Sequence, residues 1–140
     1  MDNIFYPDSM VVVGVSEKAD NLSKNIVENL LRFGFAGKLH LIGRQPGELQ
    51  GMPILTSMDE LPSDIDLAII LTPAQTVPNI IDQLGKSHIQ YAVIETAGFS
   101  EFSEEGRMLE EEIGKTAQKW DMKIVGPNCV GIMCMDHGIN

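Results

Sequence analysis

The chain has 140 residues, of which 44% are hydrophobic, and a formal net charge of −10 at pH 7. This length and apolar content exclude a disordered chain and suit one domain with its own core. The negative charge argues against a general nucleic-acid binder, which would show a basic face, and no apolar run approaches the ~20 residues that cross a membrane.

The first predicted unit is a buried strand, a turn and a helix. Residues 10–13 are apolar and end at Gly14, a polar loop spans 17–22, and apolar residues then recur at helical spacing up to Gly34. Asn21 or Ser23 is expected to cap this helix. Because the first N–H groups of a helix are unpaired and lie at the positive end of its dipole, the turn predicts an anion site, most often for phosphate.

Strands and helices then alternate along the rest of the chain. Further strands are predicted at 37–42, 66–71, 91–94 and 123–126, with a brief one at 54–55, and further helices at 77–84 and between Ser103 and Trp120. The segment after Met133 has no pattern that predicts structure. This order predicts an α/β fold in which a Rossmann-like, doubly wound parallel sheet forms three αβα layers and a single domain over residues 1–140.

In such a sheet, ligands bind beyond the carboxyl ends of the strands. Four turns should meet there, at 14–16, 43–44, 72–74 and 96–98, with the turn at 127–129 nearby. The sequence contains no phosphate-binding P-loop motif, and Ser16 stands where the dinucleotide fingerprint has its second glycine.

After the second strand, Arg44 stands where NAD-binding proteins place an acidic residue for the ribose hydroxyls. A cation there favours a ribose with an extra phosphate, as in NADP or coenzyme A (CoA). Arg44 is either the partner of that phosphate or a solvated loop residue.

Six motifs occur in order over nearly the whole chain. They are residues 5–14, 29–38, 61–62 with 66–70, 72–74 with 77–78, 96–99 with 104–106, and 126–132, which read Gly-Pro-Asn-Cys-Val-Gly-Ile. Their order is similar to that of the CoA-binding domain of NDP-forming acyl-CoA synthetases. This family includes the ADP-forming acetyl-CoA synthetases and the α subunit of succinyl-CoA synthetase. The ordered set is more specific than any one of its members.

The resemblance implies that CoA lies across the strand ends. Its phosphates would lie at the turn formed by residues 14–16. The adenosine or pantetheine portion would be lined by residues 72–74, and the thiol would lie toward residues 96–98 and 128–129. The predicted cofactor-binding residues are Gly14, Val15, Ser16, Ser23, Arg44, Thr72, Pro73, Ala74, Thr96, Gly98, Asn128 and Cys129.

The chain departs from the family pattern in three ways. Ser23 replaces a glycine at the helix start, and residues 43–45 replace Asn-Pro-Lys after the second strand. The third departure is length. In the family, acyl transfer needs a phosphorylated histidine in the next domain and a nucleotide-grasp domain, and neither is in this sequence. None of His40, His88 and His137 matches that histidine.

We therefore expect that this chain alone does not catalyse the ligase reaction. It should be the N-terminal part of a longer synthetase, or one subunit of it, with ligase and nucleotide-grasp domains as partners. A homo-oligomer is compatible with the sequence, and neither nucleic acid nor membrane is an expected partner.

Two other functions stay open, an NADP-binding module and a ligand-sensing module without ligase activity. Cys129 either faces a thiol or thioester or fills a small apolar space, and packing is the favoured role. Cys129, Cys134 and His137 match no zinc-binding spacing, so no metal site is predicted. The N-terminus lacks the basic region of a signal peptide, so a cytoplasmic location with reduced thiols is expected.

Overall fold

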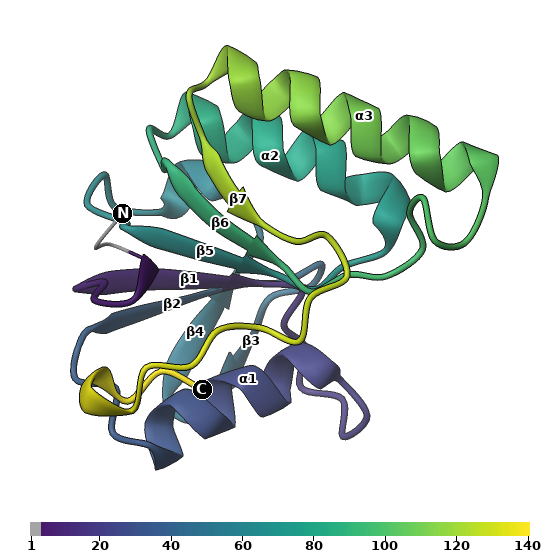
Figure 1. Ribbon diagram of the computed structural model, residues 1–140. Helices are drawn as coiled ribbons and strands as arrows, with labels where there is room; N and C mark the ends of the chain where they lie inside the picture. Colours follow the sequence, from purple (N-terminus) through teal and green to yellow (C-terminus); the bar gives the residue numbers. More distant parts are fainter. Residues whose placement is uncertain (1–3) are drawn as a thin grey trace.

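Short strands rich in branched apolar residues build the centre of the molecule, as expected of a parallel sheet buried on both faces. The computed structural model describes residues 4–140 (Figure 1). Its strands are β1 (Ser9–Val13), β2 (Lys38–Ile42), β3 (Gly47–Leu49), β4 (Met52–Leu55), β5 (Leu67–Ile70), β6 (Tyr91–Ile94) and β7 (Lys123–Val125). They form one seven-stranded sheet in the order β3-β4-β2-β1-β5-β6-β7.

Every strand pair in the sheet is parallel except β3 with β4. The helices are α1 (Leu22–Arg32), α2 (Val77–Lys86) and α3 (Glu104–Lys119). Helices α2 and α3 cover one face and α1 lies on the other (Figure 1). The predicted α/β fold with a parallel sheet in three layers is confirmed.

Two hydrophobic clusters fill the spaces between these layers. Alternate residues of β1 point to opposite faces, so that Val11 and Val13 join α2 and α3 while Met10 and Val12 join α1. Pro78 lies in the first turn of α2, where the missing N–H of proline is tolerated. No helix among residues 4–140 is both long and apolar enough to span a lipid bilayer.

Helices α2 and α3 meet at a glycine. A Cβ placed on Gly85 would lie 2.2 Å from Cγ of Trp120, so the indole packs directly on the α2 backbone. The ring is fixed at its other end because Trp120 Nε1 donates to Asp82 Oδ1 over 2.8 Å. Lys119 and Lys86 also pair with Asp82, and these three hydrogen bonds hold the pKa of its carboxyl well below the ordinary value.

The segment after β7, for which no structure is predicted beyond Met133, covers the face that α1 leaves open. It runs along α1 in Figure 1, and Ile139 is only 1% exposed within the α1-side cluster. His137 Nε2 lies 3.1 Å from the carbonyl oxygen of Pro7, and Gly138 packs on the backbone of residues 33–35. This segment therefore takes the place of a second helix on that side of the sheet.

Candidate functional site

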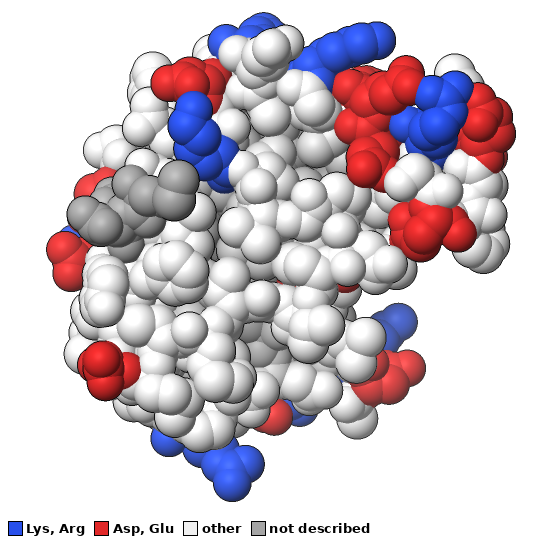
Figure 2. Space-filling model, in the orientation of Figure 1, with Lys and Arg blue, Asp and Glu red and all other residues white. Residues whose placement is uncertain are grey.

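The carboxyl ends of the parallel strands converge at one edge of the sheet. The turns after β1, β5, β6 and β7 meet there, on the side where α1 and α3 begin (Figure 1). Figure 2 shows the surface hollowed at this edge, between α3 and the loop that connects β1 to α1. The predicted site residues follow these strands, except Arg44, which follows β2.

Asn21 organises the turn between β1 and α1. As the N-cap of α1, its Oδ1 accepts from Lys24 N over 2.8 Å and from Ser16 N over 3.3 Å, and its Nδ2 donates to Gly14 O over 2.9 Å. The amides of Gly14 and Val15 both donate to Ile42 O over 2.9 Å. None of the three amides at 14–16 is therefore free to hold an anion.

The free donors lie one step further along the chain. Within residues 4–140, the main-chain N–H groups of Leu22 and Ser23, the first two residues of α1, have no acceptor. They border an open cavity of about 310 Å³ between α1 and the turn after β5. The cavity is lined by Ser16, Lys18, Asp20, Asn21, Leu22, Ser23, Leu71, Thr72 and Pro73.

Ser23 joins two of the turns beneath this cavity. The whole residue is only 1% exposed, and its Oγ donates to Leu71 O over 3.2 Å. Gly14, with a φ of +107°, leaves the space for this contact, since a Cβ there would lie 2.2 Å from Leu71 O. The hydroxyl of Ser23 is thus engaged by the end of β5.

A second group of predicted residues joins the turns after β5, β6 and β7. Thr96 Oγ1 donates to Thr72 O over 2.8 Å and accepts from Thr72 N over 3.1 Å, and Asn128 N donates to Thr96 O over 2.9 Å. A Cβ placed on Gly98 would lie 3.6 Å from Cβ of Ala74, so the turns after β5 and β6 lie close together. Cys129 Sγ donates to Ile94 O over 3.4 Å, which suits its expected packing role.

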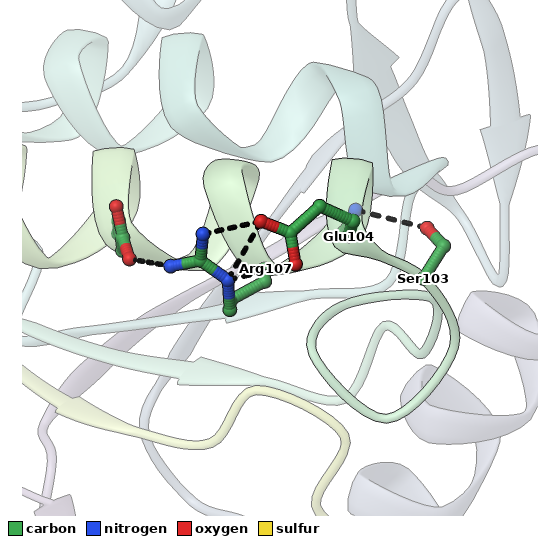
Figure 3. Close-up of polar contacts among 5 residues, drawn as sticks. Ser103, Glu104 and Arg107 are labelled. Atoms are coloured by element: carbon green, nitrogen blue, oxygen red, sulfur yellow. Dashed lines mark hydrogen bonds and ion pairs between the residues drawn. The ribbon is translucent and has the colours of Figure 1, made fainter.

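The loop between β6 and α3 is held by α3. Gly106 has room for no side chain, because a Cβ there would lie 2.1 Å from Phe99 O. Ser103 caps the helix by accepting from Gly106 N, and Arg107 lies between Glu104 and Glu111 on the exposed face (Figure 3). The loop after β6 is therefore packed firmly against the start of α3, at the carboxyl edge of the sheet.

Two charged residues at this edge were not among the predicted site residues. Lys18 lines the cavity at the start of α1, whereas Arg44 is exposed after β2 and does not line it. Glu95 follows β6 and lines a second cavity of about 130 Å³, where burial raises the pKa of its carboxyl. Lys18 lies in a polar loop, and Glu95 follows Val93 and Ile94 and precedes Thr96. Neither residue stands in a recognisable motif.

Comparison with known proteins gives one consistent result. The family description "CoA binding domain" matches residues 8–135. The ADP-forming acetate–CoA ligase I of Archaeoglobus fulgidus is 34% identical over 140 residues, which is 100% of this chain and 20% of that protein. The ADP-forming 4-hydroxybutyrate–CoA ligase of Nitrosopumilus maritimus is 34% identical over 133 residues, which is 95% of this chain and 19% of that protein.

The same similarity extends to solved structures. The apo form of dinucleotide forming acetyl-coenzyme A synthetase 1 from Ca. Korarchaeum cryptofilum matches with a TM-score of 0.93 and 32% identity. The match covers 99% of this chain and 30% of that chain. This chain spans about a fifth of the length of the two curated relatives named above.

Proposed function

Because the chain belongs to the family of CoA binding domains, we propose that it binds coenzyme A, or an acyl-CoA, across the carboxyl edge of its sheet. The cavity at the start of α1 carries this proposal. It combines the start of α1, where the main-chain amides of Leu22 and Ser23 have no acceptor within residues 4–140, with Lys18 among the lining residues. Main-chain amides at a helix N-terminus are a common site for phosphate oxygens.

The donors at this cavity fit the diphosphate of CoA. The amides of Leu22 and Ser23 lie at the positive end of the α1 dipole, and Lys18 adds a charged donor. Asp20 on the same rim has the opposite charge and offsets Lys18 at long range. The attraction therefore depends on the short contacts made by the amides, which the overall charge of −10 does not cancel.

We place the remaining parts of CoA on either side of the diphosphate. Arg44 follows β2 on one side of β1, where a cation suits the extra phosphate of the CoA ribose. The uncharged pantetheine would cross the turns after β5 and β6, with its thiol toward Asn128 and Cys129. This arrangement uses the predicted turns at 43–44, 72–74, 96–98 and 127–129, and places the diphosphate beside the turn at 14–16.

The chain would form the N-terminal part of a longer ADP-forming acyl-CoA synthetase, since the relatives named above are about five times its length. This domain would hold CoA while ligase and nucleotide-grasp domains or subunits carry out the transfer. The named relatives act on acetate and 4-hydroxybutyrate, which each have one carboxyl group. We propose a monocarboxylic acyl substrate and a cytoplasmic location.

Isothermal calorimetry with CoA, acetyl-CoA, NADP and ADP at one fixed salt concentration tests the proposal. CoA and acetyl-CoA should bind with similar affinity, and NADP at least about tenfold more weakly. Lys18→Ala should weaken CoA binding by about 10- to 100-fold, which corresponds to the ~1.5–3 kcal/mol of a charged hydrogen bond. Equal affinity for NADP, or no binding of CoA, would contradict the proposed function.

The matched control is Lys115→Ala. Lys115 is exposed on α3, away from the cavity, so this variant makes the same change in net charge without removing a proposed contact. It should bind CoA as the parent chain does. An equal loss in both variants would show that Lys18 acts through net charge alone.

A further inference from the structure

Glu95 is a carboxylate at the carboxyl edge with no partner among residues 4–140. It follows β6, and its side chain lies on the same face as Val93, toward α1. It is half-buried and has neither a hydrogen bond nor an ion pair within the described chain. The other acid that follows β6, Glu101, differs because its Oε1 accepts from the amides of Gly98 and Phe99.

The surroundings of Glu95 hold no cation. Its cavity of about 130 Å³ is lined mainly by apolar side chains of α1, β5 and the segment after β7, with Asn29 and Asn140, and by no lysine or arginine. The backbone of Gly131 lies close, since a Cβ there would be 2.9 Å from Glu95 Oε1. Burial raises the pKa of the Glu95 carboxyl, because its negative charge is poorly solvated there.

The cations of the edge lie at its β1–β2 end, which also carries the acids Glu17 and Asp20. Lys18 and Arg44 follow β1 and β2, whereas Glu95 follows β6 on the other side of β1. Glu95 also stands between two residues that hold the turn after β7, because Ile94 O accepts from Cys129 Sγ and Thr96 O accepts from Asn128 N. An anionic group that enters the β6–β7 end would meet a like charge in a poorly solvated place.

We propose that Glu95 is a specificity-determining residue that excludes anionic groups from the β6–β7 end of the edge. It would direct the phosphates of the ligand toward β1 and β2. It would also favour acyl groups without a second carboxylate. This inference rests on the proposed CoA-binding function and deepens it, because it assigns the choice of acyl group to one side chain of this domain.

The test compares CoA, acetyl-CoA and succinyl-CoA by calorimetry with the whole chain. The parent chain should bind CoA and acetyl-CoA alike and succinyl-CoA at least about tenfold more weakly, as expected for like charges a few ångströms apart. Glu95→Gln keeps the size of the side chain and removes its charge. This variant should bind succinyl-CoA within about twofold of acetyl-CoA.

Glu112→Gln is the control, because Glu112 is an exposed carboxylate on α3 and its loss changes the net charge equally. It should leave the discrimination unchanged. Folding of Glu95→Gln is checked by its melting temperature at pH 7, which should be no lower than that of the parent, since a desolvated charge has been removed.

Equal binding of the three ligands by the parent chain would overturn the inference and leave CoA binding intact. So would a preference for acetyl-CoA that survives in Glu95→Gln or disappears in Glu112→Gln. If neither the parent chain nor the variants bind CoA, the proposed function itself fails, and the inference fails with it.

Discussion

At the scale of single residues, the imidazole of His40 limits stability in mild acid. His40 shares a sheet face with Val11 and Ile42, and its buried Nε2 has no hydrogen-bond partner within residues 4–140. Burial lowers the pKa of its ring, an effect that the charge of Asp64 opposes and that of Lys38 reinforces. Charging the ring therefore favours the unfolded chain.

The pH window follows from this direction. A histidine whose pKa is lowered on folding contributes its full stability above the unfolded value of about 6.5. That contribution is lost as the pH falls from 6.5 through the folded value. The carboxylates with lowered pKa, such as Asp64 and Asp82, lose their contributions only below the ordinary carboxyl range. In the interval from about pH 6.5 to 5, His40 therefore loses stability, whereas Glu95, whose pKa is raised, changes in the opposite direction.

We predict that His40→Leu flattens the stability curve in this interval. Urea unfolding at several pH values measures the free energy of unfolding of both chains. The parent should lose stability between about pH 6.5 and 5, and the variant should lose clearly less. The control is His88→Asn, which removes an exposed imidazole and keeps a residue that tolerates a φ of +63°. If the parent and His40→Leu curves run parallel, the imidazole of His40 is not the source.

At the scale of elements, two glycines in neighbouring helices should respond to alanine with opposite signs. Gly85→Ala would place a Cβ inside the indole of Trp120, whose ring is held by Asp82. Overpacking of this kind costs about 1–3 kcal/mol, which outweighs the ~1 kcal/mol gain in helix propensity. We therefore predict that Gly85→Ala lowers the free energy of unfolding.

Gly114→Ala is the matched change in α3. A Cβ there would have no atom within 4 Å and Gly114 is exposed, so only the propensity term remains. This variant should be more stable than the parent by up to ~1 kcal/mol. Urea unfolding of both variants measures the pair, and stabilisation by Gly85→Ala would show that the indole can move aside.

The start of α1 permits a direct test of a main-chain contact. Leu22 is the first residue of the helix and is exposed, and Asn21 before it has an extended conformation that suits a residue preceding proline. Leu22→Pro therefore removes one proposed phosphate donor while keeping the helix, because proline is tolerated at this position.

We predict that Leu22→Pro weakens CoA binding by about tenfold, which corresponds to the loss of one hydrogen bond of ~1.5 kcal/mol to a charged group. Leu22→Ala keeps the N–H and should bind as the parent does. Calorimetry measures the affinities, and circular dichroism checks that the helix remains. Unchanged binding by Leu22→Pro would remove this amide from the site.

At the scale of the whole molecule, regular patterns predict the fold and local contacts decide the details of the site. The periodic apolar residues of β1, α2 and β6 predict those elements and their order. The short strand β3 has no such pattern, and the segment after β7 is held by single contacts of Ile139, His137 and Gly138 with distant parts of the chain. Sequence spacing carries no signal for contacts of that kind.

The same limit applies to the candidate site. The turns that meet at the carboxyl edge follow from the topology, so their residues could be predicted. Which donors remain free could not, because Asn21 and Ile42 engage the amides of the turn at 14–16. The positions of Lys18 and Glu95 against the cavities likewise depend on tertiary packing. The site residues predicted from the sequence therefore stay predictions, and a measurement of CoA binding tests them.

The net charge of −10 gives the final prediction, since CoA is itself a polyanion. Repulsion between the two acts over the Debye length, which is about 30 Å at 0.01 M salt and about 8 Å at 0.15 M. Added salt should therefore speed association, the reverse of the usual effect for oppositely charged partners. The short contacts in the cavity are screened less, so dissociation should change little.

Stopped-flow measurement of CoA association at these two salt concentrations tests this argument. We expect the association rate constant to rise several-fold from about 0.01 to 0.15 M salt. Pantetheine, which has no phosphates, should show no such rise. A rate constant that falls with salt would mean that the local field of Lys18 and the α1 terminus, and not the charge of the whole chain, governs the approach of the ligand.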